Sequence, residues 1–158
     1  MKVLVVSDSH GNVENVCRAI DLVQPRMLLH LGDGWRDAQE AARRYPDLPI
    51  EKVPGNCDFR RDEMAERLIV ICGRLFLLCH GHTLGVKSSY NELLRAALEH
   101  KADAVLFGHT HIPFTDFRRG VMLLNPGSVG DFQKPTYAVL TFTGGAFVPA
   151  TYVLPPAG

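Results

Sequence analysis

The first third of the chain alternates short apolar runs with stretches of helical periodicity. Residues 1–7 and 27–31 are mostly apolar, as in strands buried on both faces, and residues 50–53 are predicted to form a third strand. Between them, apolar residues recur at three- and four-residue spacing, and Pro25 and Pro46 follow the two stripes. The pattern predicts a βαβαβ unit with parallel strands and right-handed helical crossovers. The stripes consist of Val13, Val16, Cys17, Ile20 and Val23, and of Ala38, Ala41, Ala42 and Tyr45.

The pattern then changes to segments typical of antiparallel strands. Residues 67–72 and 75–79 flank Gly73-Arg74 and predict a hairpin. Ser89-Tyr90-Asn91-Glu92 matches a capping box that opens a helix ending near residue 100. A further buried strand is predicted at 104–107, and antiparallel strands at 114–118, 121–124, 137–142 and 146–153.

Five of these strands end in polar turns that contain glycine, at residues 8–11, 32–34, 55–58, 80–82 and 108–111. The carboxyl ends of strands in an open α/β sheet face one crevice, so we expect the turns to converge at one edge of a single sheet. They carry most of the candidate ligands of the chain: Asp8, His10, Asp33, Asn56, Asp58, His80, His82, His109 and His111.

Mixed imidazole and carboxylate ligands suit manganese, iron, zinc, cobalt or nickel. Taken singly, each motif has a plain structural explanation: a Gly-Asp after a strand is usually a turn or helix cap, and Asn-Cys-Asp is typical of an Asx turn. Together, the five turns predict a dinuclear metal site. In an extended segment, residues two apart point to the same side. The pairs with this spacing are Asp8/His10, His80/His82 and His109/His111.

The order of these motifs resembles the calcineurin-like metallophosphoesterases. The Gly-Asn-Cys-Asp variant at 55–58 and the short length are similar to the small bacterial and archaeal phosphodiesterase branch, as is Asn-Pro-Gly-Ser at 125–128. The likeness covers roughly residues 1–130. It implies an α/β fold, an αββα sandwich of two mixed β-sheets flanked by helices, and we expect residues 1–158 to form one such domain.

The resemblance also implies two divalent metal ions, with manganese the leading expectation and iron, zinc, nickel or cobalt as alternatives. It assigns Asp8, His10 and His111 to one ion, Asn56, His80 and His109 to the other, and Asp33 to both. Spacing alone leaves open whether His80 or His82 is the ligand. Asn56, Asp58 and His82 are the candidate catalytic residues, with His82 near the phosphate or outside the ligand shell. Asp58 either orients an imidazole or caps a helix or turn.

The implied reaction is phosphodiester hydrolysis by attack of a metal-bound hydroxide. Larger family members carry histidine where this chain has Cys57. A thiol, with a reference pKa of about 8.5, is a poor substitute for imidazole as an acid. We therefore expect esters with good leaving groups to react fastest.

Two other functions fit the same fold. A phosphomonoesterase would need extra positive groups, and the motif turns contain no arginine, although Arg36 or Arg60 could fold over the cleft. A eukaryotic retromer subunit with this fold is a scaffold, but here all seven expected ligands are present.

Composition limits the partners. The chain has 158 residues and zero formal net charge, which gives no reason to expect a nucleic-acid polymer or a membrane. A small phosphodiester is the expected substrate, and a homo-oligomer is possible. The early first strand leaves no room for a signal peptide, and Cys17, Cys72 and Cys79 resemble core residues, so we expect a reduced, cytoplasmic setting. Ser9 and Asn12 are candidate phosphate contacts, although helix capping is the favoured role for Asn12. Trp35 either lines the cleft or packs over the second helix.

Overall fold

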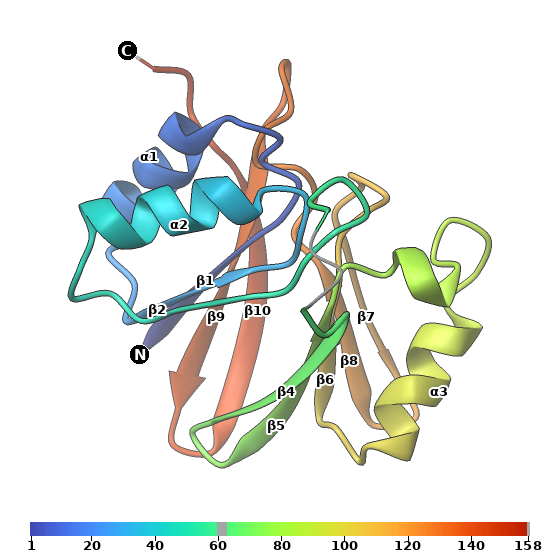
Figure 1. Cartoon of the computed structure of the whole chain (residues 1–158). Coiled ribbons are helices and arrows are strands. Elements are labelled where there is room, and N and C mark those ends of the chain that lie inside the picture. Colours follow the sequence, from blue (N-terminus) through green and yellow to red (C-terminus); the bar gives the residue numbers. More distant parts are fainter. Residues whose placement is uncertain (60–62, 158) are drawn as a thin grey trace.

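The computed structural model describes residues 1–59 and 63–157 (Figure 1). In these ranges the chain forms two five-stranded sheets and three α-helices. The elements are β1 (Lys2–Val6), α1 (Val13–Val23), β2 (Met27–His30), α2 (Trp35–Arg44), β3 (Ile50–Lys52), β4 (Glu66–Ile71), β5 (Arg74–Cys79), a 3-10 helix η1 (His82–Leu84), α3 (Asn91–Glu99), β6 (Ala104–Leu106), β7 (Phe114–Arg118), β8 (Val121–Asn125), β9 (Thr136–Thr143) and β10 (Ala146–Val153).

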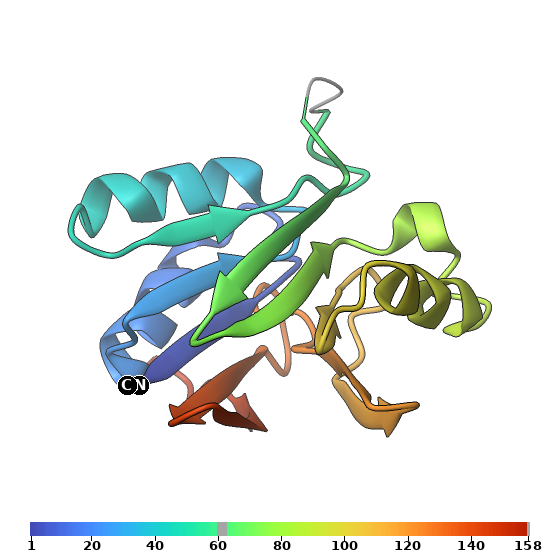
Figure 2. The same ribbon diagram turned by 90° about the horizontal axis from the view of Figure 1, so that it is seen from below.

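The first sheet has the strand order β10-β9-β1-β2-β3. Strands β1, β2 and β3 are parallel, with α1 and α2 as their crossovers, so the predicted βαβαβ unit is confirmed. The end of the chain returns to this sheet, because β9 pairs antiparallel with β1 and β10 with β9. Both crossover helices cover the same outer face of the sheet (Figure 2).

The second sheet has the order β4-β5-β6-β8-β7 and is also mixed. Strands β5, β6 and β8 are parallel, whereas β4 and β7 pair antiparallel at the two edges. Helix α3 covers the outer face, so the layers are helices, sheet, sheet and helix (Figure 2). The αββα sandwich is therefore confirmed.

Side-chain alternation along β1 shows how one strand serves two apolar layers. Val3 and Val5 lie in the core between the two sheets, whereas Leu4 and Val6 lie in the core beneath α1 and α2. Successive strand residues point to opposite faces, so a continuous apolar run is what this middle layer requires. A third core joins the second sheet to α3.

Two local predictions were wrong. The β4–β5 turn is Cys72-Gly73, one residue earlier than expected, with φ of 50° and 78°. A two-residue hairpin turn with positive φ at both positions matches the twist of the strands, and it leaves Cys72 exposed. Helix α3 has Tyr90 as its N-cap, with no side-chain cap, so Ser89 does not form the predicted capping box. Cys17 and Cys79 are buried as expected. None of the described helices has the length and apolar character needed to span a membrane.

Candidate metal centre

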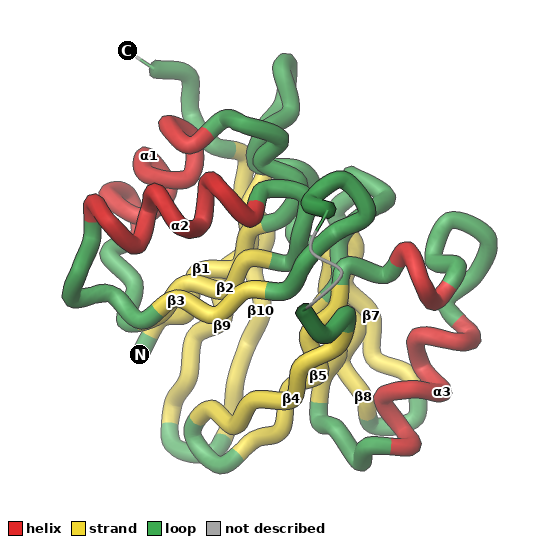
Figure 3. The backbone as a smooth tube through the Cα atoms, in the orientation of Figure 1, coloured by secondary structure: helices red, strands yellow, loops and turns green. Residues whose placement is uncertain are grey.

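The polar turns meet at one edge of the sandwich (Figure 3). Turns after β1, β2 and β3 belong to the first sheet and those after β5 and β6 to the second, so the expectation of a single sheet was wrong. Backbone hydrogen bonds join neighbouring turns: Asp8 N donates to Gly32 O at 2.9 Å, and Gly108 N donates to His80 O at 3.0 Å. The N–H of His109 links the two sheets by donating to Oδ2 of Asp8 at 3.1 Å.

Left-handed backbone conformations are concentrated in these turns. For residues other than glycine this conformation is uncommon, and it persists only where the surrounding structure holds it. Such residues cluster at ligand sites more often than elsewhere, which agrees with the predicted role of the turns. The site residues with positive φ are Asp8 (54°), His10 (45°), Asp33 (55°), His109 (71°) and His111 (64°).

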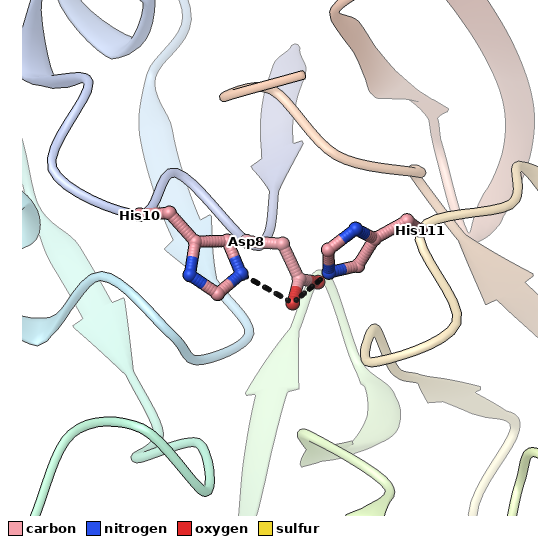
Figure 4. Close-up of side chains that lie close together, drawn as sticks. All are labelled: Asp8, His10 and His111. Atoms are coloured by element: carbon pink, nitrogen blue, oxygen red, sulfur yellow. Dashed lines mark ion pairs between the residues drawn. The ribbon is translucent and has the colours of Figure 1, made fainter. Parts of the chain in front are cut away.

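Asp8 places one oxygen at the centre of the site. Its Oδ2 accepts hydrogen bonds from the Ser7 hydroxyl at 2.6 Å and from the His109 N–H. Its Oδ1 is buried and has no hydrogen-bond partner among the described residues. That oxygen lies 3.1 Å from Nε2 of His111 and 3.5 Å from Nε2 of His10 (Figure 4). A buried carboxylate oxygen without a donor is costly, and a cation held with the two imidazoles would satisfy it.

A second cluster lies beside the first. Ligand atoms of Asp33, His80 and His109 are all within 4.8 Å of one another. Nδ1 of His80 lies 2.8 Å from the carbonyl oxygen of Leu31, which fixes the ring with Nε2 toward the cluster. That Nε2 is 3.3 Å from Oδ2 of Asp33, and the same oxygen is 3.7 Å from Nε2 of His10. Asp33 therefore lies between the two clusters, at the position expected of a shared ligand.

The electrostatics of the site favour positive charge. Burial raises the pKa of Asp33, but the hydrogen bond and charge of His80 outweigh it and hold that pKa well below its usual range. Burial lowers the pKa of His80, but Asp33 and Asp8 outweigh it and raise that pKa overall. Two carboxylates thus stabilise a cationic group between them, and a divalent metal would compete with the proton of His80 for that place.

Comparison with known proteins decides the family. The family model of the calcineurin-like phosphoesterase superfamily domain matches residues 1–145. The chain belongs to this family. The probable metallophosphoesterase YsnB of Bacillus subtilis is 34% identical over 92% of this chain and 87% of its own length. Phosphodiesterase YfcE of Escherichia coli K12 is 30% identical over 82% of this chain and 79% of its own length.

A solved structure supports the fold of this calcineurin-like phosphoesterase. The crystal structure of a conserved Streptococcus pneumoniae TIGR4 protein, described as a predicted phosphoesterase, has a TM-score of 0.79 to this chain at 24% identity. The matched region covers 96% of this chain and 88% of the Streptococcus pneumoniae chain. At that identity the likeness bears on the fold alone. Membership of the family implies metal ions, and the clustered carboxylates and imidazoles are suited to hold them.

Asn56 and Cys57 occupy the turn after β3. Both are exposed, and the Asn56 amide donates a hydrogen bond to Sγ of Cys57 at 3.5 Å. Sγ of Cys57 lies within 4.8 Å of ligand atoms of His10 and Asp33, so the thiol faces the site. Burial and the negative charge of Asp33 raise the pKa of Cys57, which keeps it a neutral thiol. The role of Asn56 as a metal ligand stays a prediction.

Asp58 caps backbone groups rather than imidazoles. Its Oδ2 accepts from the N–H groups of Asp33 and Gly55 at 2.8 and 2.7 Å, and its Oδ1 accepts from Gly34 and Trp35 at 2.9 and 3.0 Å. The suggested hydrogen bond to an imidazole is therefore not made among the described residues. Asp58 instead satisfies the N-terminus of α2 and fixes the backbone of Asp33.

His82 lies next to the second cluster. Its ring centroid is 5.5 Å from that of His80 and 6.2 Å from that of His109. Its Nδ1 is buried and has no hydrogen-bond partner among the described residues. Burial and the nearby His80 lower the pKa of His82, so the ring is neutral near pH 7. A phosphate contact by His82 stays a prediction, and the proximity of its ring to His80 and His109 is the feature that supports it.

Ser9 supports the site from beneath and does not face a substrate. It is fully buried, and its hydroxyl donates to Oδ2 of Asp37 at 2.6 Å and lies 2.8 Å from Nε2 of His30. The N–H of Gly11 donates to the same Asp37 oxygen at 2.8 Å. The expectation that Ser9 contacts phosphate was wrong, because the Ser9 hydroxyl is hydrogen-bonded to Asp37 instead. Sequence reasoning missed Asp37, whose one signal is a carboxylate in the first turn of α2.

The buried His30 gives a pH-dependent contribution to stability. Burial lowers its pKa from 6.5 to about 4. Between these values the unfolded chain binds more protons, so stability should fall as pH decreases from 6.5 towards 4. The contribution is at most about 3 kcal/mol. Urea unfolding at several pH values should show this slope in the wild type and a flatter one in His30→Asn. An unchanged slope in His30→Asn would contradict the assignment, and exposed His100→Asn should retain the wild-type slope.

The Asn-Pro-Gly-Ser segment braces two ligand turns. Nδ2 of Asn125 donates to Gly108 O at 3.1 Å and to the Thr110 hydroxyl at 3.0 Å. The Ser128 hydroxyl donates to the carbonyl oxygen of Asp8 at 2.8 Å. Both residues therefore support the rim of the site. Asn12 caps α1 by accepting from the N–H of Asn15 at 3.1 Å, as expected.

Proposed function

We propose that the chain is a phosphodiesterase that holds two divalent cations, manganese in the first instance. The supporting observation is the buried Oδ1 of Asp8, which has no hydrogen-bond donor among the described residues but faces imidazole nitrogens. We assign Asp8, His10 and His111 to one cation and His80, His109 and Asn56 to the other, with Asp33 shared.

Two divalent cations in such a site supply hydroxide near neutral pH and neutralise charge on the phosphoryl oxygens. The protein's own groups position these ligands. Asp58 fixes the backbone of Asp33, the Leu31 carbonyl orients His80, and Ser7 holds Oδ2 of Asp8 so that Oδ1 faces inward. We assign His82, whose ring lies beside those of His80 and His109, to contact with a phosphoryl oxygen.

A diester is favoured over a monoester by the charge of the site. Both clusters consist of carboxylates and imidazoles, and a thiol lies beside them. Arg36 lines the neighbouring cleft, but among the described residues it makes no ion pair with Asp8 or Asp33, and Arg60 lies outside those residues. A monoester carries a second negative charge that would need such a group. A scaffold without catalysis is disfavoured because both clusters retain their carboxylates and imidazoles.

The test is hydrolysis of bis(p-nitrophenyl) phosphate by purified protein. We expect hydrolysis that depends on added manganese, stops with a chelator, and is faster than hydrolysis of p-nitrophenyl phosphate. Metal-loaded protein that hydrolyses no aryl phosphodiester would overturn the proposal. Faster hydrolysis of p-nitrophenyl phosphate would instead identify the chain as a phosphomonoesterase.

A further inference from the structure

A cleft of about 620 Å³ opens beside the metal clusters, between the start of α2 and the turn after β3. His10, Asp33 and Cys57, which are close together at the metal clusters, line this cleft. A substrate with its phosphoryl group at the clusters would therefore extend into this cleft. Trp35, Arg36 and Phe59 line the same cleft.

Arg36 is a cation without a counter-charge among residues 1–59 and 63–157. It is exposed in the cleft, and no ion pair or hydrogen bond joins its guanidinium to another described residue. Elsewhere on α2 the arginines are paired: Arg43 binds Glu40, and Arg44 binds Glu40 and Glu14. Arg36 is therefore available to an anion from outside.

The three carboxylates of the cleft have partners other than Arg36. Oδ2 of Asp33 lies 3.3 Å from Nε2 of His80 and 3.7 Å from Nε2 of His10. Both oxygens of Asp58 accept backbone N–H groups. Asp37 is buried, and its Oδ2 accepts from Ser9 and Gly11. These carboxylates already accept hydrogen bonds from other groups, so Arg36 presents positive charge in the cleft.

Phe59 adds an open aromatic face. Its side chain is 86% exposed, and its backbone is left-handed, with φ of 54°. By contrast, the Trp35 ring is 8% exposed and has Lys52 Nζ 4.7 Å from its centroid. An exposed aromatic side chain beside a polar cleft is suited to stack on a planar ring.

We propose that this cleft binds the nucleotide part of the substrate, with a base against Phe59 and a second phosphate at Arg36. Arg36 recognises the phosphate by charge-assisted hydrogen bonds, and Phe59 recognises the base by stacking. This inference rests on the proposed function, because it places one phosphate at the metal clusters. It adds that the substrate carries a further phosphate and a planar ring.

The test uses fluorescence of Trp35, which is the only tryptophan of the chain and lines the cleft. Zinc-loaded protein is titrated with three probes, since zinc has no unpaired electrons to quench the signal. The first probe, α,β-methylene ADP, has a base and two phosphorus groups. The second, AMP, has the base but only one phosphorus group, and the third, methylenediphosphonate, has two phosphorus groups and no base. The variants are Arg36→Gln, Phe59→Leu and, as the matched control on the same helix, Arg43→Gln.

Arg36→Gln should weaken binding of α,β-methylene ADP and methylenediphosphonate about tenfold, and of AMP less than about twofold. Phe59→Leu should weaken α,β-methylene ADP and AMP about fivefold and leave methylenediphosphonate unchanged. Arg43→Gln should match the wild type for all three.

If Arg36→Gln and Phe59→Leu weaken the binding of all three probes equally, or weaken the binding of none, the proposed nucleotide subsite is wrong. Hydrolysis of bis(p-nitrophenyl) phosphate by the wild type is measured in parallel. If that hydrolysis occurs and the probe pattern fails, the subsite alone is wrong. If the hydrolysis fails, the proposed function is wrong whatever the probes show.

Discussion

Asp8→Asn is expected to lower phosphodiester hydrolysis by about a hundredfold or more. Substitution of a residue that only hydrogen-bonds to a metal ligand already costs about ten- to a hundredfold in metal affinity or activity, and Asp8 is itself assigned as a ligand. The amide oxygen of asparagine can still accept from Ser7 and from the His109 N–H, so the turn should keep its conformation. The change removes the negative charge that faces His10 and His111. The measurement is kcat/KM for bis(p-nitrophenyl) phosphate at several manganese concentrations.

The matched control for this experiment is His100→Asn, which changes an exposed polar residue at the end of α3, outside both ligand clusters. It should hydrolyse the diester at the wild-type rate. His109→Ala should behave like Asp8→Asn. Wild-type turnover in both site variants would show that the assigned clusters do not carry the reaction.

Cys57→His is expected to speed hydrolysis of diesters with poor leaving groups by about a hundredfold, the lower range for a general acid. The thiol faces the clusters, and burial and the charge of Asp33 raise its pKa, so it is a weak acid at pH 7. Imidazole at this position would protonate the departing oxygen. The measurement is log kcat/KM for aryl phosphodiesters of increasing leaving-group pKa.

The plot should be steep in the wild type and shallower in Cys57→His, because protonation reduces the negative charge that the leaving oxygen must carry. Cys57→Ser should keep the steep slope. Cys72→His, at an exposed cysteine in the β4–β5 hairpin, controls for an added imidazole elsewhere. Parallel plots for the wild type and Cys57→His would contradict the role given to this position.

The sequence predicted the strands and the metal turns because both depend on local patterns. Buried strands appear as apolar runs, and the ligands follow them at fixed short distances. The division into two sheets is a matter of pairing between distant segments: β9 joins β1, whereas β8 joins β6. Nothing in the apolar pattern distinguishes these partners, and the two-sheet expectation came from the family resemblance.

The error at Ser9 and the choice between the two roles considered for Asp58 have a similar physical origin. Both are polar residues in ligand turns, and the sequence alone leaves open whether they act in the site or satisfy groups around it. Their partners come from other segments, since Asp37 and His30 hold Ser9, and backbone groups near Asp33 hold Asp58. Hydrogen bonds between segments far apart in the sequence decide which polar groups are structural. Motifs defined by short residue spacings carry no information about such hydrogen bonds.

Metal stoichiometry with parallel activity tests the central claim most directly. Protein freed of metal by a chelator and dialysed against manganese is analysed for bound ions per chain, and hydrolysis of bis(p-nitrophenyl) phosphate is measured on the same samples. The two clusters around Asp8 and Asp33 predict that two ions bind per chain and that hydrolysis returns as they bind. A chain that binds no manganese, or that hydrolyses the diester at full rate without metal, would contradict the account.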